Sequence, residues 1–220
     1  MKFFTASLLF LSGTALALPT GLETTTLEKR TAYTTGATAN DVTNGVCAPL
    51  TVIFARGTSE SGNIGSVVGP PLFKALISAL GSSKVALQGV TYPASAAGNA
   101  NQGGDGGPTM KSLAQQALAN CPTTKIVLSG YSQGAMVVHN ALNKQGLSSS
   151  SVSAIVEFGD PLIGISAFGS VPSSKVKQYC ATGDAVCQNH SGVISSAHLS
   201  YGSDATDAAN FIISATGVTK

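Results

Sequence analysis

The hydrophobic positions of this 220-residue chain fall into two alternating kinds of segment. Short, continuous apolar runs rich in Val and Ile indicate strands that are covered on both faces. Between them, apolar residues recur every three or four positions, which indicates amphipathic helices. The expected strands cover 50–55, 85–92, 126–128, 152–158 and 176–180, and the expected helices lie within 70–81, 108–122, 135–146 and 203–217.

This alternation of strand and helix is typical of an α/β protein, a three-layer α/β/α sandwich built on a parallel sheet. The length predicts one domain with a sizeable core. Ligands of such sheets bind outside the carboxyl ends of the strands. We therefore expect Thr58, Ser132 and the loops that follow Phe158 and Cys180 to gather at that edge.

The first thirty residues carry signals for export and processing. Residues 1–17 have the positive start, apolar stretch and A-x-A-like cleavage site of a secretory signal peptide. Residues 18–30 end in the dibasic pair Lys29-Arg30, which is typical of a pro-segment, although a disordered mature terminus is the alternative. The folded domain would then occupy residues 31–220, and the protein would be secreted and extracellular.

Composition excludes several classes of protein. Charged residues make up 10% of the chain and hydrophobic residues 43%, which fits neither a disordered chain nor a nucleic-acid-binding one. The apolar stretch near the start is too short for a membrane span, so we expect no membrane insertion. Residues 31–220 hold nine basic and eight acidic residues, too even a balance to steer charged substrates. We expect a monomer.

Four cysteines in an exported chain favour two disulfides over a metal site. No C-x-x-C pair is present, which argues against zinc. Three pairings are possible. Because Cys180 and Cys187 bracket a short loop, we expect these two to pair and to leave Cys47 with Cys121.

The stretch from Lys125 to Gly146 places one serine between a strand and a helix. Gly130-Tyr131-Ser132-Gln133-Gly134 matches G-x-S-x-G. In this context the motif is a nucleophile elbow, a sharp turn that lifts the serine hydroxyl above the sheet edge. A Cβ at either outer position would collide with the neighbouring strand or helix, which explains the two glycines. The alternative is an ordinary glycine-rich turn, which motif and context together disfavour.

A serine nucleophile needs a base within hydrogen-bond reach, and the chain has three histidines. His139 lies roughly 10 Å down the same helix as the serine, so we expect it to be a core or surface residue. His190 belongs to Asn189-His190-Ser191, a candidate N-glycosylation sequon at Asn189 in an exposed loop. His198 precedes the last helix, where this fold class places its base, and we assign that role to it.

The orienting carboxylate must lie between nucleophile and base in the chain order serine, acid, histidine. Glu157 falls inside a strand pattern, where we expect it to be paired or at an edge, and Asp160 reads as a turn or capping acid. Asp184 lies in the loop between two cysteines, and a disulfide would hold that loop still. This reasoning favours the triad Ser132, Asp184 and His198.

A developing oxyanion needs preorganised hydrogen-bond donors. The backbone N–H after the nucleophile, that of Gln133, is one. The loop after the first strand should supply the second, and we assign it to Thr58, whose backbone N–H and hydroxyl both suit the role. A simple turn hydroxyl is the alternative interpretation of Thr58.

Taken together, these motifs resemble those of the fungal cutinases, secreted serine esterases of the α/β-hydrolase class. The matching pieces are spread over nearly all of the mature chain and are jointly specific. They are Phe54-Ala55-Arg56-Gly57-Thr58-Ser59-Glu60, Gly130-Tyr131-Ser132-Gln133-Gly134, Phe158-Gly159-Asp160-Pro161, Gly183-Asp184 and His198-Leu199-Ser200-Tyr201.

The resemblance implies a five-stranded parallel sheet without a lid, the same triad, the same oxyanion donors and the same two disulfides. It implies no cofactor or metal, and an ester substrate: cutin, a plant polyester, with short-chain esters also cleaved. The loop 93–107 and Val193-Ile194 would flank the acyl site, and Asn99 would support the oxyanion donor.

Two alternatives remain at this stage. Fungal acetylxylan esterases share much of the pattern, but the absence of Trp and the few aromatic residues leave no obvious platform for stacking sugars. A secreted protein that keeps the scaffold and acts only by binding, at a surface or on a host, is the alternative from another class.

Overall fold

A computed structural model describes Met1 and residues 31–220 of the chain. Its centre is a five-stranded parallel sheet in the order β2-β1-β3-β4-β5. The expected signal peptide and pro-segment fall outside the described residues. The strands are β1 (Leu50–Ala55), β2 (Val85–Gly89), β3 (Lys125–Tyr131), β4 (Val152–Phe158) and β5 (Val176–Tyr179).

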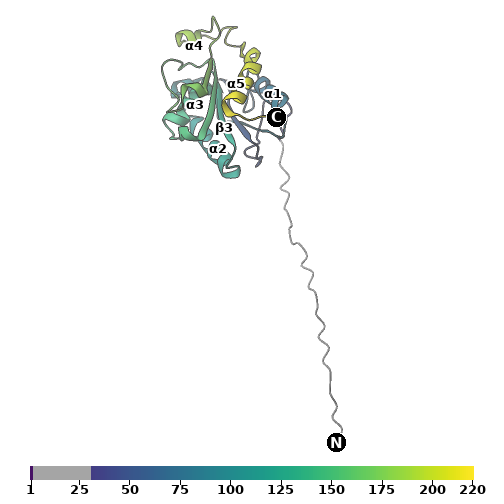
Figure 1. Cartoon of the computed structure of the whole chain (residues 1–220). Helices are drawn as coiled ribbons and strands as arrows, with labels where there is room; N and C mark the ends of the chain where they lie inside the picture. Colours follow the sequence, from purple (N-terminus) through teal and green to yellow (C-terminus); the bar gives the residue numbers. More distant parts are fainter. Residues whose placement is uncertain (2–30) are drawn as a thin grey trace.

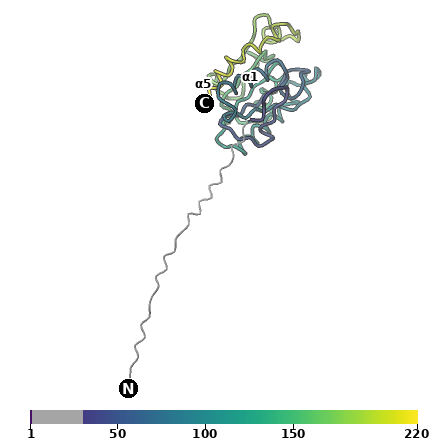
Figure 2. Tube along the Cα trace, turned by 90° about the vertical axis from the view of Figure 1, so that its right-hand side faces the viewer, coloured from purple at the N-terminus to yellow at the C-terminus, as the bar shows by residue number. Residues whose placement is uncertain are grey.

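Helices cover both faces of this sheet, which confirms the predicted α/β/α sandwich (Figure 1). One layer consists of α1 (Gly69–Leu80) and α5 (Ala205–Thr216), which lie side by side on the face seen in Figure 2. The other consists of α2 (Gly107–Asn120) and α3 (Gln133–Asn143). Prolines stand in the first turn of α1 and of α2, where the missing N–H costs no hydrogen bond.

Alternation along the strands divides the core into two halves. In β1, Leu50, Val52 and Phe54 face the layer of α1 and α5, whereas Ile53 and Ala55 face α2 and α3. All six residues of β1 are buried because helices cover both faces. The continuous apolar runs of the sequence follow directly from this double coverage.

The carboxyl ends of the strands share one edge, and the loops that follow them build the site described below. A short helix, α4 (Ala185–Asn189), follows β5 and lies at this edge, at the top of Figure 1. Within residues 31–220, every helix is too short or too polar to cross a bilayer.

Several ends of the expected elements differ in the structure: β3 runs from Lys125 to Tyr131 rather than over 126–128, and β5 ends at Tyr179 rather than at 180. The second strand stops at Gly89 rather than at 92, because the chain turns away after Val90 donates its N–H to the Phe54 carbonyl at 2.8 Å. Ser203 does not cap the last helix: it lies in a 3₁₀ turn, η4 (Tyr201–Asp204), and its hydroxyl donates to the Ser200 carbonyl at 2.8 Å. The helix therefore begins only at Ala205.

Candidate active site

Ser132 occupies the single residue between β3 and α3, in a backbone conformation that few non-glycine residues adopt. Its φ and ψ are 56° and −117°, and its N–H donates to the Phe158 carbonyl of β4 at 2.9 Å. Such strained geometry persists only where the surroundings hold it in place. Here the chain reverses sharply from strand into helix, as a nucleophile elbow requires.

The glycines on either side of the elbow are required by close approach. A Cβ on Gly130 would lie 2.3 Å from the carbonyl oxygen of Gly134, and one on Gly134 would lie 2.0 Å from that of Ala55. Real Cβ atoms do not approach backbone oxygens so closely. The G-x-S-x-G spacing thus lets α3 start directly against the ends of β1 and β3.

His198 and Asp184 meet at this edge as a buried pair. The imidazole Nδ1 lies 2.8 Å from Asp184 Oδ2, and the two residues are 1% and 0% exposed. The other ring nitrogen, Nε2, is buried and has no hydrogen-bond partner within the described part of the chain. His198 and Ser132 line one cavity of about 280 Å³. His198, with one ring nitrogen bound to Asp184, thus borders the same cavity as the serine.

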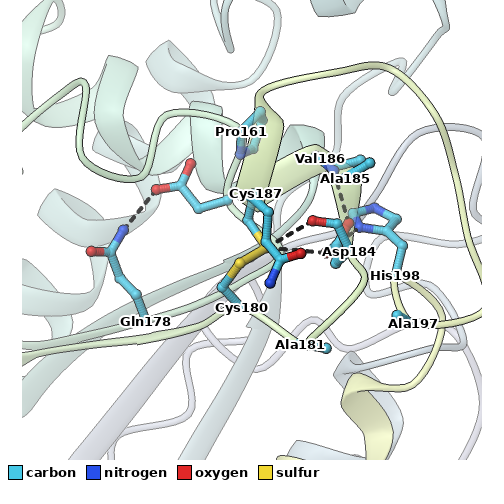
Figure 3. Close-up of a disulfide and its surroundings, with 12 residues drawn as sticks. Pro161, Gln178, Cys180, Ala181, Asp184, Ala185, Val186, Cys187, Ala197 and His198 are labelled. Atoms are coloured by element: carbon cyan, nitrogen blue, oxygen red, sulfur yellow. Dashed lines mark hydrogen bonds and ion pairs between the residues drawn. A yellow bond between two sulfur atoms is a disulfide. The ribbon is translucent and has the colours of Figure 1, made fainter.

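Asp184 is fixed by contacts from several elements, beside the Cys180–Cys187 disulfide (Figure 3). Its Oδ1 accepts the Val186 N–H of α4 at 2.9 Å, and its Oδ2 accepts the Tyr201 hydroxyl at 2.5 Å. Burial alone would raise the pKa of Asp184, but the hydrogen bonds from Tyr201, His198 and Val186 together lower it below its ordinary value. The carboxylate is thus held in its ionised form.

Three further residues fix the imidazole, and the sequence reasoning gave none of them a role. The Tyr131 hydroxyl donates to the His198 carbonyl at 2.9 Å, and the two rings pack with centroids 5.1 Å apart. A Cβ on Gly159 would lie 2.8 Å from His198 Cε1, so this glycine lets the turn after β4 pack against the ring. The Tyr201 hydroxyl contacts Asp184 Oδ2, the oxygen that also contacts the imidazole. The motifs Gly-Tyr-Ser and Phe-Gly-Asp-Pro were visible, but a sequence does not show what their side chains contact.

On the other side of Ser132, the side chain of Gln133 joins two loops. Its Nε2 donates to Ser95 O at 2.8 Å, Asn99 Oδ1 at 2.8 Å and Thr58 Oγ1 at 3.2 Å. The Thr58 hydroxyl in turn donates to Asn99 Oδ1 at 3.2 Å. The Gln133 backbone N–H opens α3, so it has no acceptor inside the helix. Thr58, Gln133 and Asn99 thus form one polar cluster beside the elbow.

The other two candidate acids, Asp160 and Glu157, and the histidine of α3 are not part of this pair. His139 is buried and pairs with Asp160 at 2.9 Å between Nε2 and Oδ2, and Gln178 donates to the same oxygen at 2.8 Å. Asp160 does accept the N–H two residues on, as expected of a turn acid, but its main partner is this histidine. Glu157 is 0% exposed within β4, which is not an edge strand, and its carboxyl oxygens have no hydrogen-bond partner among residues 31–220, so the expectation that it is paired or at an edge is wrong.

Two cavities meet at Ser132. The larger, of about 400 Å³, extends past Met136 and Val186, and the smaller extends past Val67 and Leu199. Thr58, Ser132 and Ile194 line both cavities. Val193, Ile194 and Leu199 are 64%, 56% and 55% exposed, so the entrance is apolar.

The sequon also lies near this entrance. Asn189 ends α4 and is exposed, and His190, which lines the larger cavity, contacts the Pro161 carbonyl oxygen through Nδ1 at 3.0 Å. Within residues 31–220 no cluster of His, Cys, Asp or Glu side chains is arranged to hold a metal ion.

Comparison with known proteins identifies the family of this chain. A family model described as Cutinase matches residues 46–216. Cutinase 4 of Emericella nidulans is 56% identical over 186 residues, which cover 83% of this chain and 78% of the relative. The structure of Trichoderma reesei cutinase in complex with a C11Y4 phosphonate inhibitor is similar with a TM-score of 0.74 at 40% identity, covering 82% of this chain and 80% of that one.

An acetyl xylan esterase structure is also similar, with a TM-score of 0.63 at 27% identity, covering 78% of this chain and all (100%) of that one. The family model matches most of the chain, and the Emericella relative shares more than half of the aligned residues. This chain therefore belongs to the cutinase family and is a carboxylic ester hydrolase.

Proposed function

We propose that this chain is a secreted serine esterase in which Ser132, His198 and Asp184 form the catalytic triad. The observation that carries the proposal is the Asp184–His198 hydrogen bond, made by a histidine that lines one cavity together with Ser132. Its other ring nitrogen, Nε2, has no hydrogen-bond partner among the described residues. A base oriented by a carboxylate, with its second nitrogen free, is what a serine nucleophile needs.

In this mechanism His198 Nε2 takes the proton of the Ser132 hydroxyl as the oxygen attacks the ester carbonyl. Asp184 keeps the Nδ1 proton in place and stabilises the imidazolium that forms. The backbone N–H groups of Thr58 and Gln133 receive the oxyanion, while Asn99 holds the Thr58 hydroxyl. His198 then protonates the departing alcohol, and a water molecule activated by the same nitrogen releases the acid from Ser132.

The cavities support an aliphatic ester as substrate. An ester bond at Ser132 has its acyl part on one side and its alcohol part on the other, and each side has a cavity of its own. Ile194 and Leu199, which line these cavities, and the adjoining Val193 are exposed and add apolar surface beside Ser132. We propose cutin-like polyesters and short-chain esters as the substrates, which is also what the cutinase relatives' names indicate.

The decisive test compares Ser132→Ala with Ser150→Ala on p-nitrophenyl butyrate. Ser150 is an exposed serine in the turn that precedes β4, at the opposite end of the sheet. We expect Ser132→Ala to lose activity by a factor on the order of 10⁴–10⁶ and Ser150→Ala to keep it. A fluorophosphonate should label the wild type at Ser132 only. Full activity in Ser132→Ala would refute the triad, and failure to label would leave only a binding role.

Substrate class needs a second comparison. Rates on cutin or polycaprolactone should exceed those on acetylated xylan, because the cavities beside Ser132 are lined by apolar side chains such as Met136, Val186 and Leu199. The opposite ranking would favour the acetylxylan esterases, to which the fold is also similar.

Export and modification are tested on protein secreted from a fungal host. Removal of residues 1–30 predicts Thr31 as the first residue of the secreted chain. A glycan at Asn189 would add mass to the peptide that contains it, and Asn189→Gln would abolish that mass. An N-terminus at residue 18 would instead show that only the signal peptide is removed.

A further inference from the structure

Tyr201 lies at the start of η4 and is 0% exposed. Its hydroxyl is 2.5 Å from Asp184 Oδ2, the same oxygen that His198 Nδ1 contacts at 2.8 Å. The hydroxyl also receives the backbone N–H of Ala181 at 3.0 Å. One carboxylate oxygen thus holds both the imidazole and a buried phenol.

The donors and acceptors around the Tyr201 hydroxyl determine where its proton points. A tyrosine hydroxyl has one proton to donate and can accept through its oxygen, whereas the Ala181 N–H can only donate. The oxygen therefore accepts from Ala181, and the proton is directed at Asp184. Burial raises the pKa of Tyr201, and the neighbouring Asp184 raises it further, so the phenol keeps this proton throughout the neutral range.

We propose that Tyr201 is a positioning residue of the catalytic pair: it fixes Asp184 Oδ2 opposite His198 Nδ1 and withdraws part of the charge that this oxygen offers to the imidazole. The proposal rests on the triad proposed above. Its consequence has a definite sign. Without the phenol proton, Oδ2 interacts more strongly with a protonated imidazole, so His198 holds its proton to higher pH.

The other groups around the pair do not duplicate this role. Tyr131 of β3 donates to the His198 carbonyl and not to the carboxylate. Glu60, from the loop after β1, lines the same cavity, but its oxygens are occupied by the N–H groups of Gly57, Ser66 and Val67. From α4 the Val186 N–H donates to Asp184 Oδ1 and the Gln188 N–H donates to the Asp184 carbonyl. The Cys187 sulfur lies 3.3 Å from Oδ2, but it belongs to the disulfide and has no proton to donate or to titrate.

The test compares Tyr201→Phe with Tyr179→Phe. Tyr179 donates to Asp207 at 2.6 Å, so its variant removes a tyrosine–aspartate hydrogen bond of the same kind outside the site. We expect Tyr201→Phe to lower kcat by about tenfold with KM changed less than twofold. The acidic limb of its kcat/KM profile should move up by roughly half a pH unit or more. Tyr179→Phe should leave kcat and the limb unchanged.

A readout that does not depend on activity is the NMR titration of the His198 ring. The chain has three histidines, so the His139→Gln and His190→Gln variants assign its signals. The midpoint should rise in Tyr201→Phe and stay in Tyr179→Phe. The proposal would be overturned if Tyr201→Phe changed neither the midpoint of the His198 titration nor the acidic limb of the kcat/KM profile. This holds even if the variant is less stable or slower than the wild type. Fluorophosphonate labelling of Ser132 separates this failure from failure of the triad itself, since a wrong triad would leave the wild type unlabelled.

Discussion

Removing the two disulfides one at a time should show that one bridge contributes mainly to stability and the other mainly to catalysis. Cys47–Cys121 joins the segment before β1 to the end of α2, at the amino ends of the strands and away from Ser132. Cys180–Cys187 encloses the loop that carries Asp184. The perturbation is a pair of double variants, each with alanine at both cysteines of one bridge.

The expected losses of stability follow from loop length. The bridges span 74 and 7 residues. With the loop-closure relation, the longer bridge removes denatured-state entropy worth about 4.4 kcal/mol at 25 °C, and the shorter one about 2.4 kcal/mol. At roughly 2–4 °C per kcal/mol for a domain of this size, the melting temperature should fall by roughly 9–18 °C and 5–10 °C.

For catalysis we expect the reverse order: loss of Cys180–Cys187 should lower kcat more than loss of Cys47–Cys121. The disulfide adds to the contacts that hold Asp184 in place relative to His198. In the proposed triad, a small misplacement of this carboxylate would cost much rate. We expect the variant without Cys180–Cys187 to lose kcat by about tenfold or more at 20 °C. The variant without Cys47–Cys121 should keep kcat within about twofold while it remains folded.

The assays are equilibrium urea unfolding and initial rates on p-nitrophenyl butyrate, run on the same preparations. The wild type treated with a reductant serves as a check, because both bridges are then open. Equal loss of kcat in the two double variants, or full kcat without Cys180–Cys187, would refute the reasoning. So would a larger loss of stability for the shorter loop.

Two further predictions concern a buried carboxyl in β4 and a glycine beside the His198 ring. Burial raises the pKa of Glu157 well above its ordinary value, and the unfolded chain therefore releases this proton at lower pH than the folded one. Glu157→Gln should be as stable as the wild type near pH 4 and more stable than it at higher pH. The difference in the free energy of unfolding should grow by about 1.4 kcal/mol per pH unit until the folded carboxyl ionises. Urea unfolding from pH 4 to 8 measures this difference, and a difference that does not change with pH would contradict the prediction. Gly159→Ala should lower kcat by on the order of 10²-fold, because the new Cβ would lie 2.8 Å from the His198 ring. Gly164→Ala is its control, since it has a similar positive φ and open space around it, and equal kinetics in the two would show that only backbone strain matters.

Much of the fold follows from the sequence because the sheet is covered on both faces. Each central strand then appears as an unbroken apolar run, and each helix as a periodic stripe between glycine or proline boundaries. For this reason the sequence predicts a strand at residues 126–128, within β3, and another at residues 152–158, which is β4. The ends were harder: whether a strand stops at residue 89 or 92 depends on where a neighbouring strand stops offering partners, which is a tertiary property.

The candidate site likewise contains some residues that the sequence predicts and others that it does not. Ser132, His198 and Asp184 could be proposed because few residues of each type stand in the right chain order. Tyr201 and Tyr131 could not, since an aromatic residue beside a catalytic motif looks the same whether it fills the core or holds a side chain. The buried His139–Asp160 pair likewise depends on a contact between α3 and the loop after β4.

The shared wall of the two cavities limits how substrate preference can change. Ile194 borders both cavities, which in the proposed function receive the acid part of an ester on one side and its alcohol part on the other. A smaller or larger residue there alters both preferences at once, whereas Met136 and Val67 each belong to one side only. Directed evolution toward bulkier alcohols with an unchanged acid should therefore select substitutions at one of these two positions and leave Ile194 untouched.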